Sequence, residues 1–149
     1  MTAYLAASHV VGVLALLLAW FRGGHPERFC VGVLLFNQTT VIYYDRWLVG
    51  AFEPGTAVDD VVLLLIFGVL AFRSRRWWPL VVTAALALCV VVHGLAATTP
   101  ITHYASVSAR IGLWTIIELA LLAGVLERWL AGERAVSRTA VWRRRLPTP

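Results

Sequence analysis

The sequence predicts an all-α integral membrane protein, a bundle of about five transmembrane helices, and three observations lead to this fold class. Of the 149 residues, 60% are hydrophobic and only 14% are charged, which is more apolar than a soluble domain of this size requires. The apolar residues gather in five segments separated by short polar connectors. The basic residues are all arginine and fall mainly in alternate connectors, as expected of a chain that crosses a bilayer repeatedly.

Five segments are candidates for membrane-spanning helices. A helix needs about 20 residues to cross a hydrocarbon core of about 30 Å. The first and fourth segments reach this length, and the other three do so with flanking interfacial residues. The predicted spans are residues 4–21, 29–44, 57–72, 77–97 and 105–126, in one bundle over residues 1–130. The second contains the polar run Asn37–Thr40, so a re-entrant or bundle-buried segment is its alternative.

The arginines predict the orientation of the bundle. With five spans, 11 of the 13 arginines lie on one face, and only Arg46 and Arg110 lie on the other. Basic residues in short loops concentrate on the cytoplasmic side. The N-terminus is therefore predicted outside and the C-terminus in the cytoplasm of a bacterial cell, in a multi-pass inner-membrane protein. Omitting the second span would invert every later segment and place the arginine-rich end outside.

Residues 131–149 form a predicted basic cytoplasmic tail. Its arginines and scattered apolar residues would lie well on an anionic inner-leaflet surface, and a docking site for a cytosolic protein is the alternative. Anionic lipid, and not nucleic acid, is thus the expected partner of the positive charge. Five tryptophans fall at predicted interfaces, where the indole suits both lipid and water: Trp20, Trp47, Trp77, Trp78 and Trp129. Cys30 and Cys89 are predicted to be buried free thiols.

Polar side chains inside such a bundle are the best pointers to function, because lipid makes them costly unless they are paired or hydrated. The candidates for ligand binding or a proton path are His9, Asn37, Gln38, Asp59, Asp60, His93, Arg110 and Glu118. The topology places most of them in the outer half of the bundle. Two interpretations stay open. The groups neutralise one another across helices, or they line a small cavity open to the periplasm that holds a polar ligand, an ion or a proton path.

Two alternatives concern single residues. Glu118 lies near mid-depth among apolar residues, so its carboxyl must be neutral, paired or wet. We expect a hydrogen bond to Asn37, Gln38 or a histidine rather than proton coupling. His9 and His93 fall at matched depth, which permits haem ligation by both. Histidines in separate spans are more commonly helix–helix hydrogen-bond donors, so we assign no cofactor.

The chain lacks the common catalytic motifs. It contains no G-x-S-x-G, H-E-x-x-H, Walker A or G-x-G-x-x-G pattern, and no C-x-x-C or Cys/His metal-binding spacing. We therefore expect no catalytic or metal-binding residue. The favoured function is a non-enzymatic accessory or interaction subunit, associated with another membrane protein or with a second copy. An oligomeric transporter or channel component with a periplasm-facing polar site is the alternative, and an outer-face enzyme or haem protein is the third.

Several short motifs resemble a known group of proteins. They are Gly23-Gly24-His25-Pro26-Glu27-Arg28, Asp45-Arg46, Asp60, Arg76-Trp77-Trp78-Pro79-Leu80 and His93. This pattern is similar to that of small uncharacterised inner-membrane proteins of alphaproteobacteria. The resemblance implies a bacterial inner membrane and a helical bundle, and it assigns no functional residue.

Overall fold

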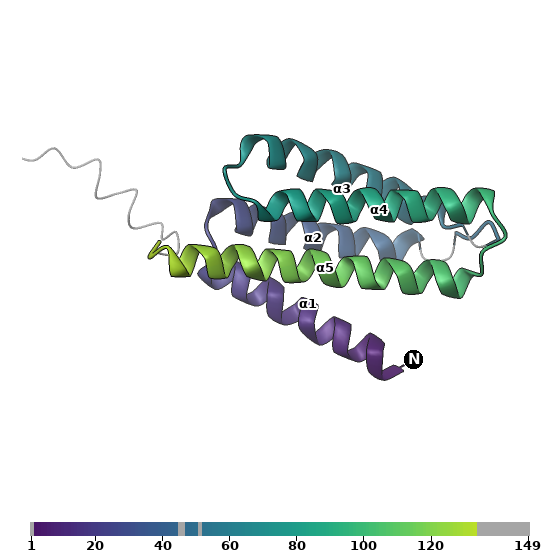
Figure 1. Ribbon diagram of the computed structural model, residues 1–149. Coiled ribbons are helices and arrows are strands. Elements are labelled where there is room, and N and C mark those ends of the chain that lie inside the picture. Colours follow the sequence, from purple (N-terminus) through teal and green to yellow (C-terminus); the bar gives the residue numbers. More distant parts are fainter. Residues whose placement is uncertain (1, 45–46, 51, 134–149) are drawn as a thin grey trace, which may run out of the picture.

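The computed structural model describes residues 2–44, 47–50 and 52–133, which fold into a bundle of five α-helices that run alternately in opposite directions (Figure 1). The helices are α1 (Thr2–Arg22), α2 (His25–Tyr44), α3 (Pro54–Arg73), α4 (Trp78–Thr98) and α5 (His103–Leu130). The predicted all-α class is confirmed. The second helix begins earlier than its predicted span and the last ends later. Most of the predicted tail, residues 134–149, lies outside the described residues, as do Asp45 and Arg46.

Three helices, α3, α4 and α5, are long and apolar enough to cross a membrane. Within the described part of α1, the apolar stretch Ala6–Arg22 is shorter. The surface of the bundle carries many large apolar side chains, among them Phe72, which is 94% exposed, and Leu65, which is 66% exposed. A water-soluble monomer rarely exposes such continuous apolar surface. Length, composition and surface therefore agree with a membrane protein.

Local chemistry fixes where the later helices begin. Pro54 and Pro79 lie in the first turns of α3 and α4, where proline's missing N–H leaves no hydrogen bond unmade. Thr102 caps α5, since its hydroxyl accepts the backbone N–H of Ala105 at 3.2 Å. In the α2–α3 connector, Val49 and Phe52 form two backbone hydrogen bonds of 2.9 and 3.1 Å.

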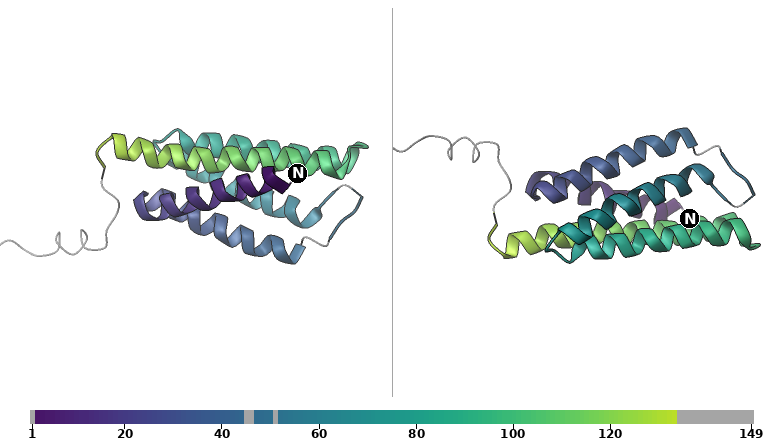
Figure 2. Two further views of the ribbon diagram at one scale, coloured as in Figure 1. Left: turned by 90° about the horizontal axis from the view of Figure 1, so that it is seen from below. Right: turned by 90° about the horizontal axis from the view of Figure 1, so that it is seen from above.

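The two ends of the bundle differ, and we name them for what gathers there. The polar end is where α2 and α4 end and α3 and α5 begin, at the right of Figure 1. The arginine end is where α1, α3 and α5 end and α2 and α4 begin, at the left. Two further views show that α1 and α2 lie together on one side of the α3–α5 group (Figure 2).

An apolar core fills the half of the bundle toward the arginine end. Its largest buried side chains include Phe67, Trp78, Leu86 and Leu121. Trp78 is fully buried and packs on Gly124 of α5, where an added side-chain carbon would collide with the indole. Trp78 begins α4, and its indole is packed inside the bundle because a glycine on the neighbouring helix makes room for the ring. Cys30 and Cys89 are buried and free, as predicted.

Candidate functional site

A cavity of about 440 Å³ lies at the polar end, between α1, α2, α3 and α5. Seven of the eight candidates chosen from the sequence line it, namely His9, Asn37, Gln38, Asp59, Asp60, Arg110 and Glu118. The eighth, His93, lies on α4 and bonds to Asp60. The structure thus brings together side chains that are more than 100 residues apart in the sequence.

Asp60 and His93 form a buried pair. The Nε2 atom of His93 lies 3.0 Å from Oδ2 of Asp60, and both side chains are about 95% buried, with exposed fractions of 4% and 5%. The ring of Phe52 stands edge-on to the imidazole, with centroids 6.3 Å apart. This contact joins α3 to α4 and leaves Asp60 facing the cavity with one partner already in place. The pair is a contact between helices of the kind that the first of the two interpretations of the sequence requires.

Arg110 pairs with Glu53, which the sequence placed on the same face but did not select. The Nη2 atom of Arg110 donates to Oε2 of Glu53 at 2.7 Å, and Nη1 donates to the Thr56 hydroxyl at 3.3 Å. Thr56 in turn donates to Oε2 of Glu53 at 2.9 Å, and Nδ1 of His103 lies 3.6 Å from Oε1. Glu53 directly precedes Pro54, and proline is common in the first turn of a helix. This position was the available sign that the Glu53 carboxyl lies at the start of a helix.

The surroundings of Glu53 shift its pKa. Burial favours the neutral form of the carboxyl. The hydrogen bond and positive charge of Arg110 act in the opposite direction, as do the hydrogen bond from Thr56 and the charge of His103. Together these contacts outweigh burial and lower the pKa of Glu53 below its ordinary value. The carboxylate form of Glu53 is therefore stabilised beside Arg110.

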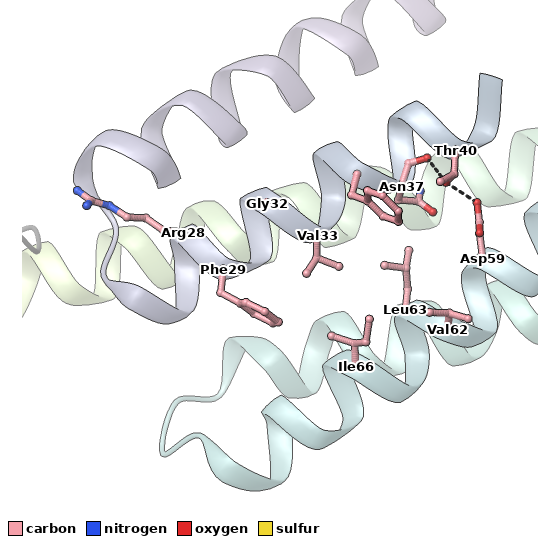
Figure 3. Close-up of a pocket in the computed structure, with 11 residues that line it drawn as sticks. Arg28, Phe29, Gly32, Val33, Asn37, Thr40, Asp59, Val62, Leu63 and Ile66 are labelled. Atoms are coloured by element: carbon pink, nitrogen blue, oxygen red, sulfur yellow. Dashed lines mark hydrogen bonds between the residues drawn. The ribbon is translucent and has the colours of Figure 1, made fainter. Parts of the chain in front are cut away.

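Asp59 and Asn37 lie on the wall between α2 and α3. Oδ2 of Asp59 accepts a hydrogen bond of 2.8 Å from the Thr40 hydroxyl, which also donates to the backbone oxygen of Asn37 (Figure 3). Asp59 forms no ion pair with any residue in the described ranges. Asn37 is only 5% exposed, and its carboxamide makes no hydrogen bond to another described residue. Asn37 lines the cavity, where its carboxamide can hydrogen-bond to a ligand.

Glu118 lies at the deeper part of the cavity wall. Its Oε1 atom occupies the space that the missing side chain of Gly12 leaves on α1. Its Oε2 atom is inaccessible and has no hydrogen-bond partner among the residues described here. His9 lies within electrostatic range of Glu118, and the predicted hydrogen bond to Asn37, Gln38 or a histidine stays a prediction. Trp114, one helical turn before Glu118, also lines the cavity.

The cavity opens at the surface and borders the packed core. His9, Gln38 and His103 line it and are exposed, so they lie where it meets the surface. Toward the arginine end, the packed core that includes Leu34, Leu63 and Leu121 follows directly. A second hollow between α2 and α3, lined by Arg28 and Leu63, adjoins the cavity at Asn37 and Asp59. The arrangement is a polar cavity at one end of the bundle, with a mostly apolar hollow beside it that extends toward the arginine end.

Haem ligation by His9 and His93 fits this arrangement poorly. His93 does not line the cavity, and its Nε2 atom is held by Asp60. Binding iron through that atom would break a buried hydrogen bond. Within the described ranges, no group of three His, Cys, Asp or Glu side chains has an arrangement that could hold a metal ion.

The arginine end carries a second set of charged contacts, which the sequence analysis missed. Glu27 is fully buried and its Oε2 atom accepts the backbone N–H of Gly24 at 2.8 Å. Arg128 lies 3.9 Å from Glu27 and 3.1 Å from Glu133, and Arg76 donates to Glu133 at 2.6 Å. These contacts join the α1–α2 turn, the α3–α4 turn and the end of α5. The Gly-Gly-His-Pro-Glu run was the available signal, because a glutamate in the first turn of a helix can bond to the preceding backbone.

Comparison with known proteins finds no matching family model, no similar curated protein and no similar solved structure.

Proposed function

We propose that the protein is a multi-spanning protein of a bacterial inner membrane that binds a small organic cation in the polar cavity. In this proposal the chain crosses the membrane five times, with its N-terminus outside and its C-terminus in the cytoplasm. The cavity then faces the periplasm. The protein acts without enzymatic activity, as an accessory subunit that presents or senses the bound cation within a larger membrane assembly.

The observation that carries this proposal is the excess of carboxylates on the cavity wall. Four acidic side chains line it, Glu53, Asp59, Asp60 and Glu118, with Arg110 as the only arginine among the described lining residues. Arg110 compensates Glu53, and His93 contacts Asp60. Asp59 has no such ion pair within the described ranges, and Glu118 has His9 within electrostatic range. A positively charged ligand would give these two carboxylates the partner that a low-dielectric site requires.

The other lining groups favour an organic cation over a metal ion. A volume of about 440 Å³ is within the range of small-molecule sites, and it far exceeds what a single ion fills. Trp114 offers an aromatic face, which attracts ammonium and guanidinium groups. Asn37 supplies a buried carboxamide that can hydrogen-bond to an N–H group of the ligand. The ligand class that uses all three features is an amine or a guanidinium compound, whereas a quaternary ammonium has no N–H and uses only the volume and the aromatic face.

The packed core beside the cavity favours binding over conduction. A transporter or channel component must connect its site to both sides of the membrane. Here the packed core lies between the cavity and the arginine end. A transport role would therefore need a second conformation, or an oligomer that opens another path, whereas a binding subunit needs neither.

Titration of the purified full chain in detergent micelles with choline and agmatine tests the proposal. We expect at least one of them to bind saturably. The binding is measured by the change in tryptophan fluorescence, because Trp114 lines the cavity. Glu118→Gln and Asp59→Asn should each weaken binding by roughly thirtyfold, since losing one partner of a buried charged contact costs about 2 kcal/mol or more.

Glu127→Gln is the matched control. It removes a carboxylate from the same helix as Glu118, but at the arginine end, where Glu127 contacts Arg76. Its affinity for the cations should equal that of the unmodified chain. Succinate should not compete with them. Absence of saturable binding by both cations, or equal losses in the control and in Glu118→Gln, would contradict the proposal.

A further inference from the structure

A groove runs between α2 and α3 and adjoins the polar cavity at Asn37 and Asp59. It consists of two adjoining hollows of about 350 and 470 Å³ that share Phe29 and Ile66. Their walls are mostly apolar and include Val33, Phe36, Val62 and Val69. Figure 3 shows the first hollow, with Arg28 at one end and Asp59 at the other.

Gly32 helps to keep this groove open. It lies on the groove wall in the middle of α2, and a side-chain carbon added there would meet no atom within 4 Å. The two helices still touch farther along, where Thr40 bonds to Asp59 at 2.8 Å. The groove is thus a persistent gap between helices that are joined toward the polar end.

Two arginines lie at the arginine end of the groove. Arg28 lines the first hollow and Arg73 the second. The Nε atom of Arg28 donates to the backbone oxygen of Trp20 at 3.0 Å, which holds the side chain beside the groove. The terminal guanidinium nitrogens of both residues make no ion pair with a carboxylate in the described ranges. They can therefore bind an oxygen anion from outside the protein.

We propose that this groove binds an anionic phospholipid, with its acyl chain along the apolar wall and its phosphate at Arg28 and Arg73. The dimensions agree with this occupant. From Arg28 to Asn37 the helix rises about 14 Å, and one leaflet of hydrocarbon is about 15 Å thick. Basic groups between transmembrane helices on the cytoplasmic side are suited to anionic headgroups. The groove shares Asn37 and Asp59 with the polar cavity, but a lipid can occupy it without a cation in the cavity.

A second copy of the chain fits the groove less well. If a parallel copy packed into it, its own Arg28 and Arg73 would lie at the same end and at the same depth. Four guanidinium groups would then lie close together, and no described acidic side chain lines this end of the groove to balance them. An anionic lipid instead brings the negative charge that the arginines lack.

Native mass spectrometry of the full chain in nanodiscs tests this assignment. The discs contain equal amounts of phosphatidylglycerol and phosphatidylcholine with identical acyl chains. We expect one retained phosphatidylglycerol per chain and little phosphatidylcholine. The double variant Arg28→Gln/Arg73→Gln should lower phosphatidylglycerol retention by roughly tenfold or more, because charge-assisted phosphate contacts are lost. Arg75→Gln is the control, because Arg75 lies two residues after Arg73 but does not line the groove. This variant should retain the lipid like the unmodified chain.

Gly32→Leu is an independent test of the lipid site, because its side chain fills the groove without changing the charge of the groove. Retention of both lipids should fall, while cation binding in the polar cavity should persist. The proposal is overturned if the two lipids are retained equally by the unmodified chain, or if the double variant keeps phosphatidylglycerol. It is also overturned if the unmodified chain is a lipid-free dimer that Gly32→Leu separates, since the groove would then be a protein interface.

Discussion

Glu53 connects two helices through one carboxylate. It lies just before α3, and its Oε2 atom accepts hydrogen bonds from Arg110 of α5 and from Thr56. Because the pair is largely buried, with 16% and 12% of the side chains exposed, solvent screens it less than a surface ion pair. The contact therefore holds the polar ends of α3 and α5 together and shapes the cavity between them.

This contact predicts a pH dependence of stability. The folded state lowers the pKa of Glu53, so the stabilisation is complete above the unfolded pKa of about 4.3 and is lost as the pH falls through the lower folded value. At neutral pH, Glu53→Gln should unfold at a lower temperature than the unmodified chain. The difference should shrink between about pH 5 and pH 3, as measured by circular dichroism in detergent. A difference that stays constant over this range would contradict the assignment.

At the level of helices, close packing depends on glycines that admit a partner's side chain. Gly12 of α1 makes room for Glu118, Gly24 makes room for Arg128, and Gly124 of α5 makes room for Trp78. Each contact joins different helices or a turn to a helix. In a membrane bundle such close approach substitutes for the hydrophobic effect, which does not distinguish lipid from protein.

Gly124 and Gly94 allow a matched test of this packing. Both are helical glycines, but an added carbon at Gly124 collides with the Trp78 ring, whereas at Gly94 it meets nothing within 4 Å. Gly124→Ala should lower the thermal unfolding midpoint, because overpacking costs about 1–3 kcal/mol. Gly94→Ala should leave the midpoint unchanged or raise it, since alanine favours helix more than glycine does. Equal midpoints for the two variants would show that the α4–α5 contact is looser than described.

The helices themselves were largely predictable from the sequence, because apolar runs and their Pro-bearing starts mark them directly. The polar run in α2 is helical, and the Thr39 and Thr40 hydroxyls are satisfied within the helix by donating to the backbone oxygens of Phe36 and Asn37. The side-chain contacts between helices were less predictable. Apolar residues surround each helix on all sides, so hydrophobic periodicity does not fix its rotation. The pairing of Arg110 with Glu53, and the burial of Trp78 against Gly124, depend on that rotation.

For the molecule as a whole, the distribution of charge predicts its orientation in the membrane. The arginine end carries Arg22, Arg28, Arg73 and the residues of the α3–α4 turn, and the polar end carries most of the carboxylates around the cavity. Basic connectors favour the cytoplasmic side. The polar end is therefore expected to face the periplasm.

Two single cysteine variants test this orientation. Thr99→Cys lies between α4 and α5 at the polar end, and Ala131→Cys follows α5 at the arginine end, where both native residues are exposed. A membrane-impermeant maleimide applied to spheroplasts should label the first and reach the second only after permeabilisation. The unmodified chain is the control, since Cys30 and Cys89 are buried. The reverse labelling pattern would contradict the predicted topology.

The polar cavity and the groove between α2 and α3 adjoin, and Asn37 and Asp59 line both spaces. A cation in the cavity and a lipid in the groove would share these two side chains. We therefore expect the two occupancies to be coupled, and thermodynamic linkage makes such a coupling reciprocal. The lipid composition of the inner leaflet would then set the affinity for a solute that arrives from the opposite side of the membrane.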